Sequence, residues 1–208
     1  MNGGSVRPTV AAHHPHAPTS ICSTAVTYDA NGNTLSYDPD GSAGPIQPRT
    51  ITYDRENCPI SVTQNGNTAS FDYGPDSERT GKSFLGQTRY FLGADAEVAF
   101  DAATPQRLLT SYLHPDVKRE GTAADFLLKD HLASNRLLIR MGGATTKADY
   151  APYGQPLTTN GSSVLTGKAY INERFDPETG LIYLPQDHEC RWSHFSLPPG
   201  LVSWNQVS

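Results

Sequence analysis

The feature that most constrains this chain is a recurring pair of residues, an aromatic followed by an aspartate, placed directly before turn-forming residues. The tyrosine forms are Tyr28-Asp29, Tyr37-Asp38 and Tyr53-Asp54, and looser forms are Phe71-Asp72 and Phe175-Asp176. An aromatic ring at a strand end covers apolar surface, and the aspartate beside it can accept backbone N–H bonds and start a turn. Such a repeat predicts stacked units that each bury one face on the next.

The segments around these pairs carry the signals of β-hairpins. Short runs rich in Thr, Val, Tyr and Phe alternate with turn residues, as in VTQNGNTASF, and continue through residues 84–113. Asn31-Gly32 and Asn65-Gly66 can each supply the positive φ angles of a primed two-residue turn. The sequence therefore predicts an all-β fold of successive antiparallel hairpins, with less than about a fifth of the residues helical.

One stretch has an ambiguous period. Residues 123–141 read AADFLLKDHLASNRLLIRM, and their apolar side chains fit either a helical stripe or two strands. If the chain contains a helix, we expect it within this stretch. The apolar positions concerned are Phe126, Leu127, Leu128, Leu132, Leu137 and Leu138.

Charge and composition argue against several classes of protein. The formal net charge is −5 and the sixteen Lys and Arg residues are scattered singly, so a nucleic-acid partner is not expected. No apolar run reaches the roughly 18 residues of a membrane span, and no signal peptide is recognised, so we expect synthesis in the cytoplasm and no membrane insertion. Cys22, Cys58 and Cys190 are few and widely spaced, which predicts reduced, incidental thiols.

Several motifs resemble a known family. TYDANGNTLSYDPDG and ITYDRENCPISV resemble the YD repeats of bacterial Rhs proteins, and residues 127–184 resemble the Rhs repeat-associated core. Within that core, KDHLASNRLL supplies Asp130, His131, Leu132, Ser134 and Arg136, the positions of an Asp-His-Leu-x-Ser-x-Arg pattern. YAPYGQPL (150–157) and GKAYINERFDPETGLIYL (167–184) follow in the family's order. The resemblance covers about residues 25–184, and three ordered motifs make it specific.

The resemblance implies an architecture and partners. In that family the YD repeats coil as a ribbon of hairpins into a hollow shell that holds a toxic C-terminal domain until delivery, and members are exported or secreted. It implies that the partners of this chain are the rest of such a shell, or neighbouring YD repeats, and a C-terminal toxin cargo. The chain then divides into a disordered lead-in (1–23), YD-repeat-like hairpins (24–126), a core-like segment (127–184) and a divergent tail (185–208).

The tail departs from the family and bears on enzymatic activity. Many family cores include an aspartyl autoprotease, whereas this chain ends in PQDHECRWSHFSLPPGLVSWNQVS. Aspartyl proteolysis needs two carboxylates that share a proton and activate a water. Asp187 and Glu189 are the only late acids and lie on one side of an extended segment, so we expect no self-cleavage and no enzyme. A residual autoprotease remains the alternative.

Other candidate sites have a plainer interpretation. His13, His14 and His16, or His188, Cys190 and His194, could ligate a metal, but neither group has a fixed geometry or a recognised ligand spacing. His114 or His131 with Asp116 or Asp130 could suggest a hydrolase, yet each lies in a strand or turn motif. We therefore predict no catalytic, metal or cofactor site.

The function expected from the sequence is structural. The prediction is a non-catalytic shell segment that encloses or displays a C-terminal effector. A segment cut from such a ribbon should be unstable alone and should aggregate or dimerise through its edges. A surface module that binds carbohydrate is a further alternative, although packing between hairpins explains its aromatic residues better. Those residues are Tyr73, Phe84, Tyr90, Phe91, Phe100 and Tyr112.

Overall fold

The computed structural model describes residues 20–21, 24–38, 48–151, 154, 156–157, 166–186 and 189–193. It confirms the predicted all-β fold. Thirteen strands, β3 to β15, form one antiparallel sheet in which every strand pairs with its neighbours along the chain. Their bounds are β3 (Thr27–Tyr28), β4 (Thr34–Tyr37), β5 (Arg49–Tyr53), β6 (Pro59–Gln64), β7 (Asn67–Tyr73), β8 (Arg79–Phe84), β9 (Gln87–Leu92), β10 (Ala96–Asp101), β11 (Thr104–His114), β12 (Val117–Glu120), β13 (Ala123–Lys129), β14 (Asn135–Arg140) and β15 (Thr145–Lys147).

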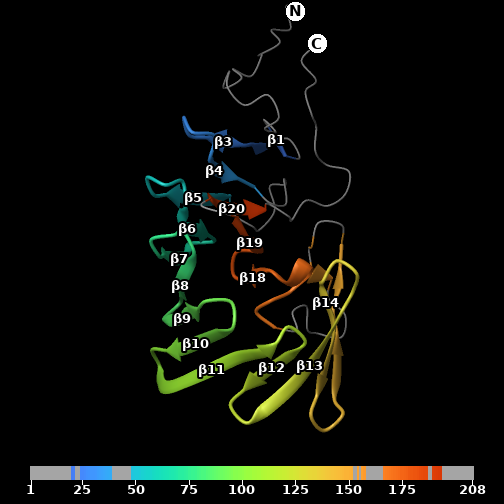
Figure 1. Ribbon diagram of the computed structural model, residues 1–208. Helices are drawn as coiled ribbons and strands as arrows, with labels where there is room; N and C mark the ends of the chain where they lie inside the picture. Colours follow the sequence, from blue (N-terminus) through green and yellow to red (C-terminus); the bar gives the residue numbers. More distant parts are fainter. Residues whose placement is uncertain are drawn as a thin grey trace, which may run out of the picture.

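Three small sheets accompany the large one. They are formed by β1 with β2, by β16 with β17, and by β18, β19 and β20. Figure 1 shows the long sheet running down from β3 and β4, bending at β11 and rising again at β14, with β18 and β19 inside the bend. Their bounds are β1 (Ser20–Ile21), β2 (Thr24–Ala25), β16 (Asp149–Tyr150), β17 (Pro156–Leu157), β18 (Arg174–Asp176), β19 (Leu181–Gln186) and β20 (Glu189–Ser193).

Two of the Tyr-Asp pairs, Tyr28-Asp29 and Tyr53-Asp54, lead into the same kind of turn. At the first, the Asp29 carboxylate oxygen Oδ1 accepts the N–H groups of Asn31 and Asn33 at 2.9 and 2.8 Å. The backbone closes the turn, because Asp29 N–H donates to Asn33 O and Gly32 N–H donates to Asp29 O. This is the three-residue hairpin loop with a bulge, in which the fourth residue has positive φ. The predicted role of the aspartate is confirmed here.

The same backbone pattern with a β-bulge before it returns three times in the described sheet. It starts at Asp54, at Gly74 and at Asp130, and the fourth residue of each turn is Asn57, Ser77 or Ala133, all with positive φ. Asp54 and Asp130 again accept two N–H groups through Oδ1. A β-bulge directly precedes each turn. The repeat is therefore a repeat of turn geometry, and it does not require glycine.

The turn at Gly74 lacks the aspartate but keeps a carboxylate in its place. Glu78, four residues later, accepts the Asp76 N–H at 3.1 Å through Oε2, as Asp29 and Asp54 accept the corresponding N–H. A Cβ added to Gly74 would lie 2.1 Å from the Glu78 Oε1 atom. Glu78 thus fills the volume that an aspartate at position 74 would need.

The tyrosines connect each hairpin to the one before it. The Tyr53 hydroxyl donates to Thr34 O and the Tyr73 hydroxyl to Pro59 O, both at 2.9 Å. Each acceptor comes directly after the preceding turn of this kind. Tyr150 repeats the contact with Asn135 O at 3.0 Å, after the turn that starts at Asp130. The tyrosine therefore does more than cover apolar surface.

Two of the predicted turns have different outcomes. Asn65 and Gly66 both have positive φ, 51° and 74°, and join β6 to β7 as the predicted primed turn. The prediction for Asn31-Gly32 was wrong, because only Gly32 has positive φ and the pair lies inside the longer bulged turn. Residue type alone does not separate these loops, since both place glycine at a position of positive φ.

The stretch with the ambiguous period is a hairpin. Residues 123–141 form β13 and β14, joined by the turn at Asp130. In the described residues the helical element named η2 is a single 3₁₀ turn, Tyr170–Asn172, so the expectation that any helix would lie within 123–141 was wrong. No helix of the described part is long and apolar enough to cross a membrane.

Cys58 corrects the prediction of reduced cysteines. It is disulfide-bonded and almost fully buried, with 1% of its surface exposed. Cys22 lies outside the described residues, and only the backbone of Cys190 is described. The lead-in 1–23 and the tail 185–208 also fall largely outside the described residues. Their predicted boundaries stay predictions.

The core lies on one face of the sheet, which we call the inner face because residues 166–186 contact it. Ile51, Val62 and Phe71 of β5–β7 point inward and pack with Leu181 of β19. A second cluster contains Tyr112, Leu127, Leu138 and Ala148. The opposite side is called the outer face.

Candidate functional site

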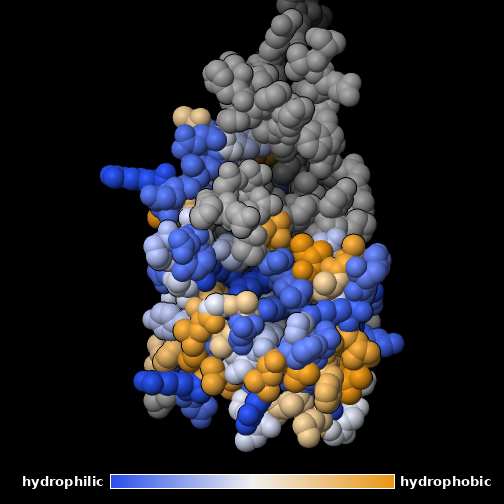
Figure 2. Space-filling view, viewed as in Figure 1, coloured by the Kyte–Doolittle hydropathy of each residue, from blue (hydrophilic) through white to orange (hydrophobic). Residues whose placement is uncertain are grey.

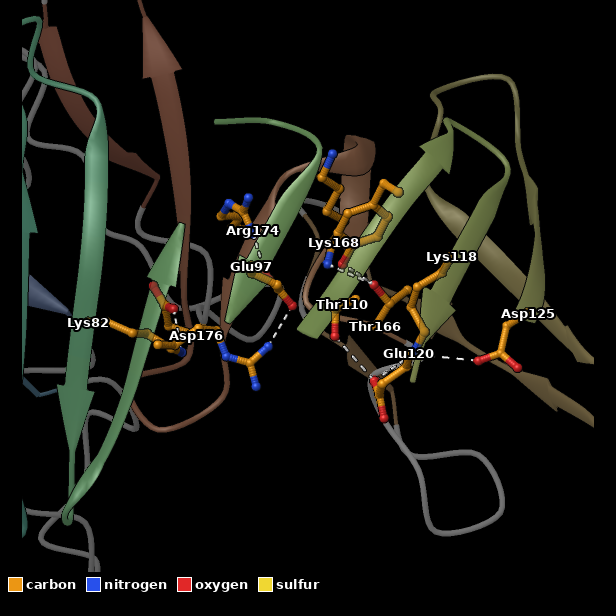
Figure 3. A network of polar contacts seen from close by, with 12 residues as sticks. Lys82, Glu97, Thr110, Lys118, Glu120, Asp125, Thr166, Lys168, Arg174 and Asp176 are labelled. Atoms are coloured by element: carbon orange, nitrogen blue, oxygen red, sulfur yellow. Dashed lines mark hydrogen bonds and ion pairs between the residues drawn. The ribbon is translucent and has the colours of Figure 1, made fainter. Parts of the chain in front are cut away.

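Charged side chains hold the C-terminal strands against the inner face of the sheet. Arg79 of β8 is fully buried, and its Nη1 lies 2.5 Å from Oδ2 of Asp176, which is equally buried. Lys82 Nζ contacts Asp176 Oδ1 at 2.8 Å and Glu178 Oε1 at 2.6 Å. Figure 3 shows Asp176 and Lys82 directed toward each other from separate strands. These ion pairs join residues that lie more than ninety positions apart in the chain.

Aromatic rings surround the buried guanidinium of Arg79. Its carbon Cζ lies 5.4 Å from the centre of the Phe71 ring, 4.9 Å from Phe91 and 4.6 Å from Tyr183. The Tyr183 hydroxyl also accepts the Arg79 N–H at 3.0 Å. The attraction of the aromatic faces and of the carboxylate offsets the cost of removing the Arg79 charge from water.

A second group of ion pairs lies on the neighbouring strands. Glu97 of β10 accepts Arg89 at 2.6 Å and Arg174 at 2.5 Å, one on each carboxylate oxygen. Arg174 also stacks on Phe91, with 4.1 Å between Cζ and the ring centre, and donates to Gly93 O. Figure 3 shows Glu97 beside Arg174. β18 is thus fastened to two different places on the sheet, through Arg174 and Asp176.

A third group continues the polar lining toward β13. Lys118 Nζ lies 3.3 Å from Glu120 Oε2 and 3.6 Å from Asp125 Oδ2. Tyr112 and Thr166 share a hydrogen bond of 2.9 Å between their hydroxyl groups, and burial raises the pKa of Tyr112 to about 12. The polar contacts therefore extend over β8 to β13, much of the length of the sheet.

The cations around Asp176 favour its ionised form. Burial alone would raise the pKa of Asp176, but the charges of Arg79 and Lys82 and their hydrogen bonds hold the pKa below its ordinary value. An aspartyl protease needs one carboxyl group that keeps its proton beside another. Asp176 and Glu178 instead share a lysine as two carboxylates.

A hollow of about 520 Å³ lies between the inner face and residues 166–178. Charges of both signs line it, including those of the first two groups of ion pairs, together with apolar side chains such as Phe84, Phe91 and Leu108. Within the residues that the structure describes, no group of three or more His, Cys, Asp and Glu side chains gathers as a metal site would. The charged side chains that line the hollow include Arg79, Lys82, Arg89, Glu97, Arg174 and Asp176.

Of the candidates named from the sequence, the described residues bring His114 and Asp116 into contact. His114, at the end of β11, lies 3.6 Å from the neighbouring Asp116 between Nδ1 and Oδ2, and both are exposed. His131 is exposed in the turn after β13, where Asp130 is engaged by backbone N–H groups. Asp187, His188, His194, His13, His14 and His16 lie outside the described residues, and Glu189 and Cys190 are described only as backbone of β20.

The ion-pair network was missed in the sequence. One signal was present, since Phe175-Asp176 is a loose form of the aromatic-aspartate pair and lies in the core-like segment. A second signal was the charged residue at an inward position of a strand, such as Glu97 within AEVAF. Neither signal names its partner, because the partners come from strands far away in the chain.

Comparison with known proteins places this chain beside much larger ones. No family model matches it. Over 179 residues, or 80% of the chain, it is 26% identical to the tRNA nuclease WapA of Bacillus subtilis strain 168 and to the tRNA3(Ser)-specific nuclease WapA of Bacillus spizizenii. A stretch of 87 residues, 39% of the chain, is 34% identical to salivary gland surface protein 1 of Aedes aegypti. The chain spans only 7% of each WapA protein and 3% of the mosquito protein.

Solved structures show where this fold occurs. The crystal structure of TcdB2-TccC3 matches 79% of this chain with a TM-score of 0.57 and 15% identity, and the match covers 10% of that chain. The structure of TcdB2-TccC3-TEV matches 75% with a TM-score of 0.55 and 16% identity, over 9% of that chain. The likeness is one of fold. Together with the WapA matches, it supports the resemblance to Rhs proteins drawn from the sequence.

Proposed function

We propose that this chain is a non-catalytic wall segment of an Rhs-type toxin shell, which encloses or displays a C-terminal effector. The observation that carries the proposal is the single sheet of thirteen strands joined by successive hairpins. In the first half of the sheet, Tyr53 and Tyr73 each tie a hairpin to the one before it, so this unit can be repeated along a longer ribbon. The small share of each relative that the chain covers supports a part of a longer wall.

The lining of the inner face supports the same proposal. Where Glu97, Lys118 and Asp125 point inward, their charges are already paired, Glu97 with two arginines and Lys118 with Asp125. All three side chains are buried, so these ion pairs stabilise the wall itself and are not offered to a cargo.

A wall segment must have sheet edges that pair with further strands. The outermost strands of the sheet are β3 and β15. The Ala148 N–H donates to Arg136 O, on the side of β14. Because backbone donors alternate in direction along a strand, the Thr145 N–H points away from β14, toward the free edge. A proline at position 145 removes an outward donor and leaves the inner ladder intact.

We expect the purified chain to self-associate as its concentration rises, through these edges. Sedimentation velocity should show larger species for the wild type and for Thr145→Ala, and fewer for Thr145→Pro. A monomer at every concentration, with a sharp cooperative melt, would contradict the wall proposal because it would indicate a closed fold.

The non-catalytic part of the proposal is tested on the same sample. We expect the intact mass to stay constant during incubation between about pH 4 and pH 8, the range over which a carboxylate pair would change its protonation. Loss of a C-terminal peptide that is abolished by Asp187→Ala or Glu189→Ala, but not by the exposed control Asp116→Ala, would favour the autoprotease instead.

A further inference from the structure

The outer face of the sheet changes character between β8 and β9. Over β5–β8 it carries small hydroxyl side chains that bond to each other across strands. The Thr52 and Ser61 hydroxyls lie 2.6 Å apart, and those of Thr63 and Thr68 lie 2.8 Å apart. Their cross-strand register places these side chains on the side opposite Ile51 and Val62. This part of the outer face suits contact with water.

Over β9–β14 the outer face is apolar instead. Tyr90, Val98 and Leu109 are successive cross-strand partners and form one row on β9, β10 and β11. Val117, Phe126 and Ile139 form a second row on β12, β13 and β14. Leu109 is 50% exposed and Phe126 is 49% exposed. Figure 2 shows hydrophobic residues gathered in the lower part of the molecule, where β10–β13 lie in Figure 1, and mainly hydrophilic ones above.

These six residues, which we call the outer rows, have no second layer over them among the described residues. A sheet with an apolar face is normally covered by another layer, and a contiguous exposed apolar patch marks an interaction surface. The inner face of the same strands is already covered by residues 166–178. The outer rows are therefore the side of β9–β14 that is available to a partner.

The charges beside the outer rows have one sign. The strand register places three basic residues on the outer face of β9–β15, and it places no Asp or Glu of these described strands there. The three are exposed, and they are Arg107, Arg119 and Lys147. Arg107 stacks on Phe100, with 5.3 Å between its Cζ and the ring centre. None of the three takes part in an ion pair found among the described residues. This face is cationic although the chain carries a net charge of −5.

We propose that the outer rows dock a protein partner through an amphipathic segment with an apolar centre and carboxylate flanks. The apolar side chains of the partner would cover Leu109 and Phe126, and its carboxylates would pair with Arg107, Arg119 and Lys147. A bilayer of anionic lipid fits less well, since three separate cations on a chain of net negative charge give little attraction to such a surface. The docking site goes beyond the wall function, because it lies on the face away from any enclosed cargo.

The test uses two labelled synthetic peptides of about 18 residues, each designed as a helix with leucines along one face. One carries glutamates beside the leucines and the other carries lysines at the same positions. We expect fluorescence anisotropy with the full chain to show binding of the glutamate peptide about tenfold tighter than that of the lysine peptide. Leu109→Ser should abolish binding of the glutamate peptide, and Arg107→Gln with Arg119→Gln should remove most of the tenfold preference.

The matched control lies on the hydroxyl part of the outer face. Thr63→Ala should leave the binding of both peptides unchanged, and circular dichroism should show that every variant keeps its β signal. Equal affinity for the two peptides, or no binding of either, would overturn the proposal. So would binding of the chain to vesicles of phosphatidylcholine with phosphatidylglycerol in the absence of peptide binding, since that outcome identifies a lipid surface as the occupant.

Discussion

The first half of the sheet, β4–β8, and the second half, β9–β14, use the same hairpins but distribute polarity differently. In the first half, Ile51, Val62 and Phe71 point inward and hydroxyl side chains point outward. In the second half, charged residues such as Glu97 and Asp125 point inward while Leu109 and Phe126 point outward. The turn therefore sets the path of the chain, whereas the covering layer decides which side chains each face can carry.

The covering layer differs in the same way. Leu181 of β19 packs onto the apolar inner face of the first half. Arg174 and Asp176 of β18 bring charges to the region where the halves meet, at Glu97 and Arg79. Each part of the inner face is therefore matched by the segment that crosses it.

The largest effect should come from breaking the buried ion pair at that junction. Asp176→Ala leaves Arg79 buried without its carboxylate, and we expect the free energy of unfolding to fall by about 3–5 kcal/mol. The control is Asp149→Ala, which breaks an exposed pair with Arg136 at 2.6 Å and should cost less than about 1 kcal/mol. Urea unfolding of the three proteins measures both changes.

The stability of the wild type and of Asp176→Ala should also depend differently on pH. Because the folded state lowers the pKa of Asp176 below its ordinary 3.8, its contribution is present above that value and is lost as the pH falls through the folded-state pKa. The wild type should therefore lose more stability than Asp176→Ala on acidification below about pH 4. If the free energy of unfolding falls equally in the two proteins as the pH is lowered, Asp176 is not stabilised as a carboxylate.

The next effect concerns the exchanged carboxylate in the turn at Gly74. Glu78→Ala should cost about 0.5–1.5 kcal/mol, because the Asp76 N–H loses its acceptor. Gly74→Asp alone should also destabilise, since its side chain would enter the volume of the Glu78 carboxylate. The double variant Gly74→Asp with Glu78→Ala should be more stable in urea unfolding than either single variant. Purely additive losses of stability would show that Glu78 does not stand in for the aspartate of the other turns.

The smallest effect should come from the tyrosines that link hairpins. Tyr53→Phe removes the bond to Thr34 O, and we expect a loss of about 0.5–1.5 kcal/mol in thermal or urea unfolding. Tyr90→Phe, on the outer face, serves as the control and should change stability little. If the two variants behave alike, the hydroxyl contact does not hold the hairpins together.

Much of the fold was predictable from local residues. The turns at Asp29 and Asp54 can be predicted from the aspartate alone, because its carboxylate accepts the N–H groups two and four positions later. Period alone left residues 123–141 open, since Leu127 and Leu138 are cross-strand partners only once the turn at Asp130 is recognised. The misassigned turn at Asn31-Gly32 arose because glycine serves both kinds of loop.

The inner-face network was not predictable in the same way. Arg79 and Asp176 lie 97 positions apart, and no local pattern relates them. The bond from Tyr53 to Thr34 O was also missed, because it depends on how the preceding hairpin ends. The disulfide bond of Cys58 was also missed, because the wide spacing of the three cysteines indicates no pairing.

The tyrosine contacts have a consequence for how such a sheet can change in evolution. The hydroxyl groups of Tyr53 and Tyr73 each donate to a carbonyl at the end of the hairpin immediately before them. A duplicated or deleted hairpin pair would therefore carry its own anchor and find an equivalent acceptor at the new junction. Genes for such sheets could lengthen or shorten in whole hairpins at modest cost, whereas the strands bound through Arg79 and Glu97 would have to keep their partners at a fixed distance along the wall.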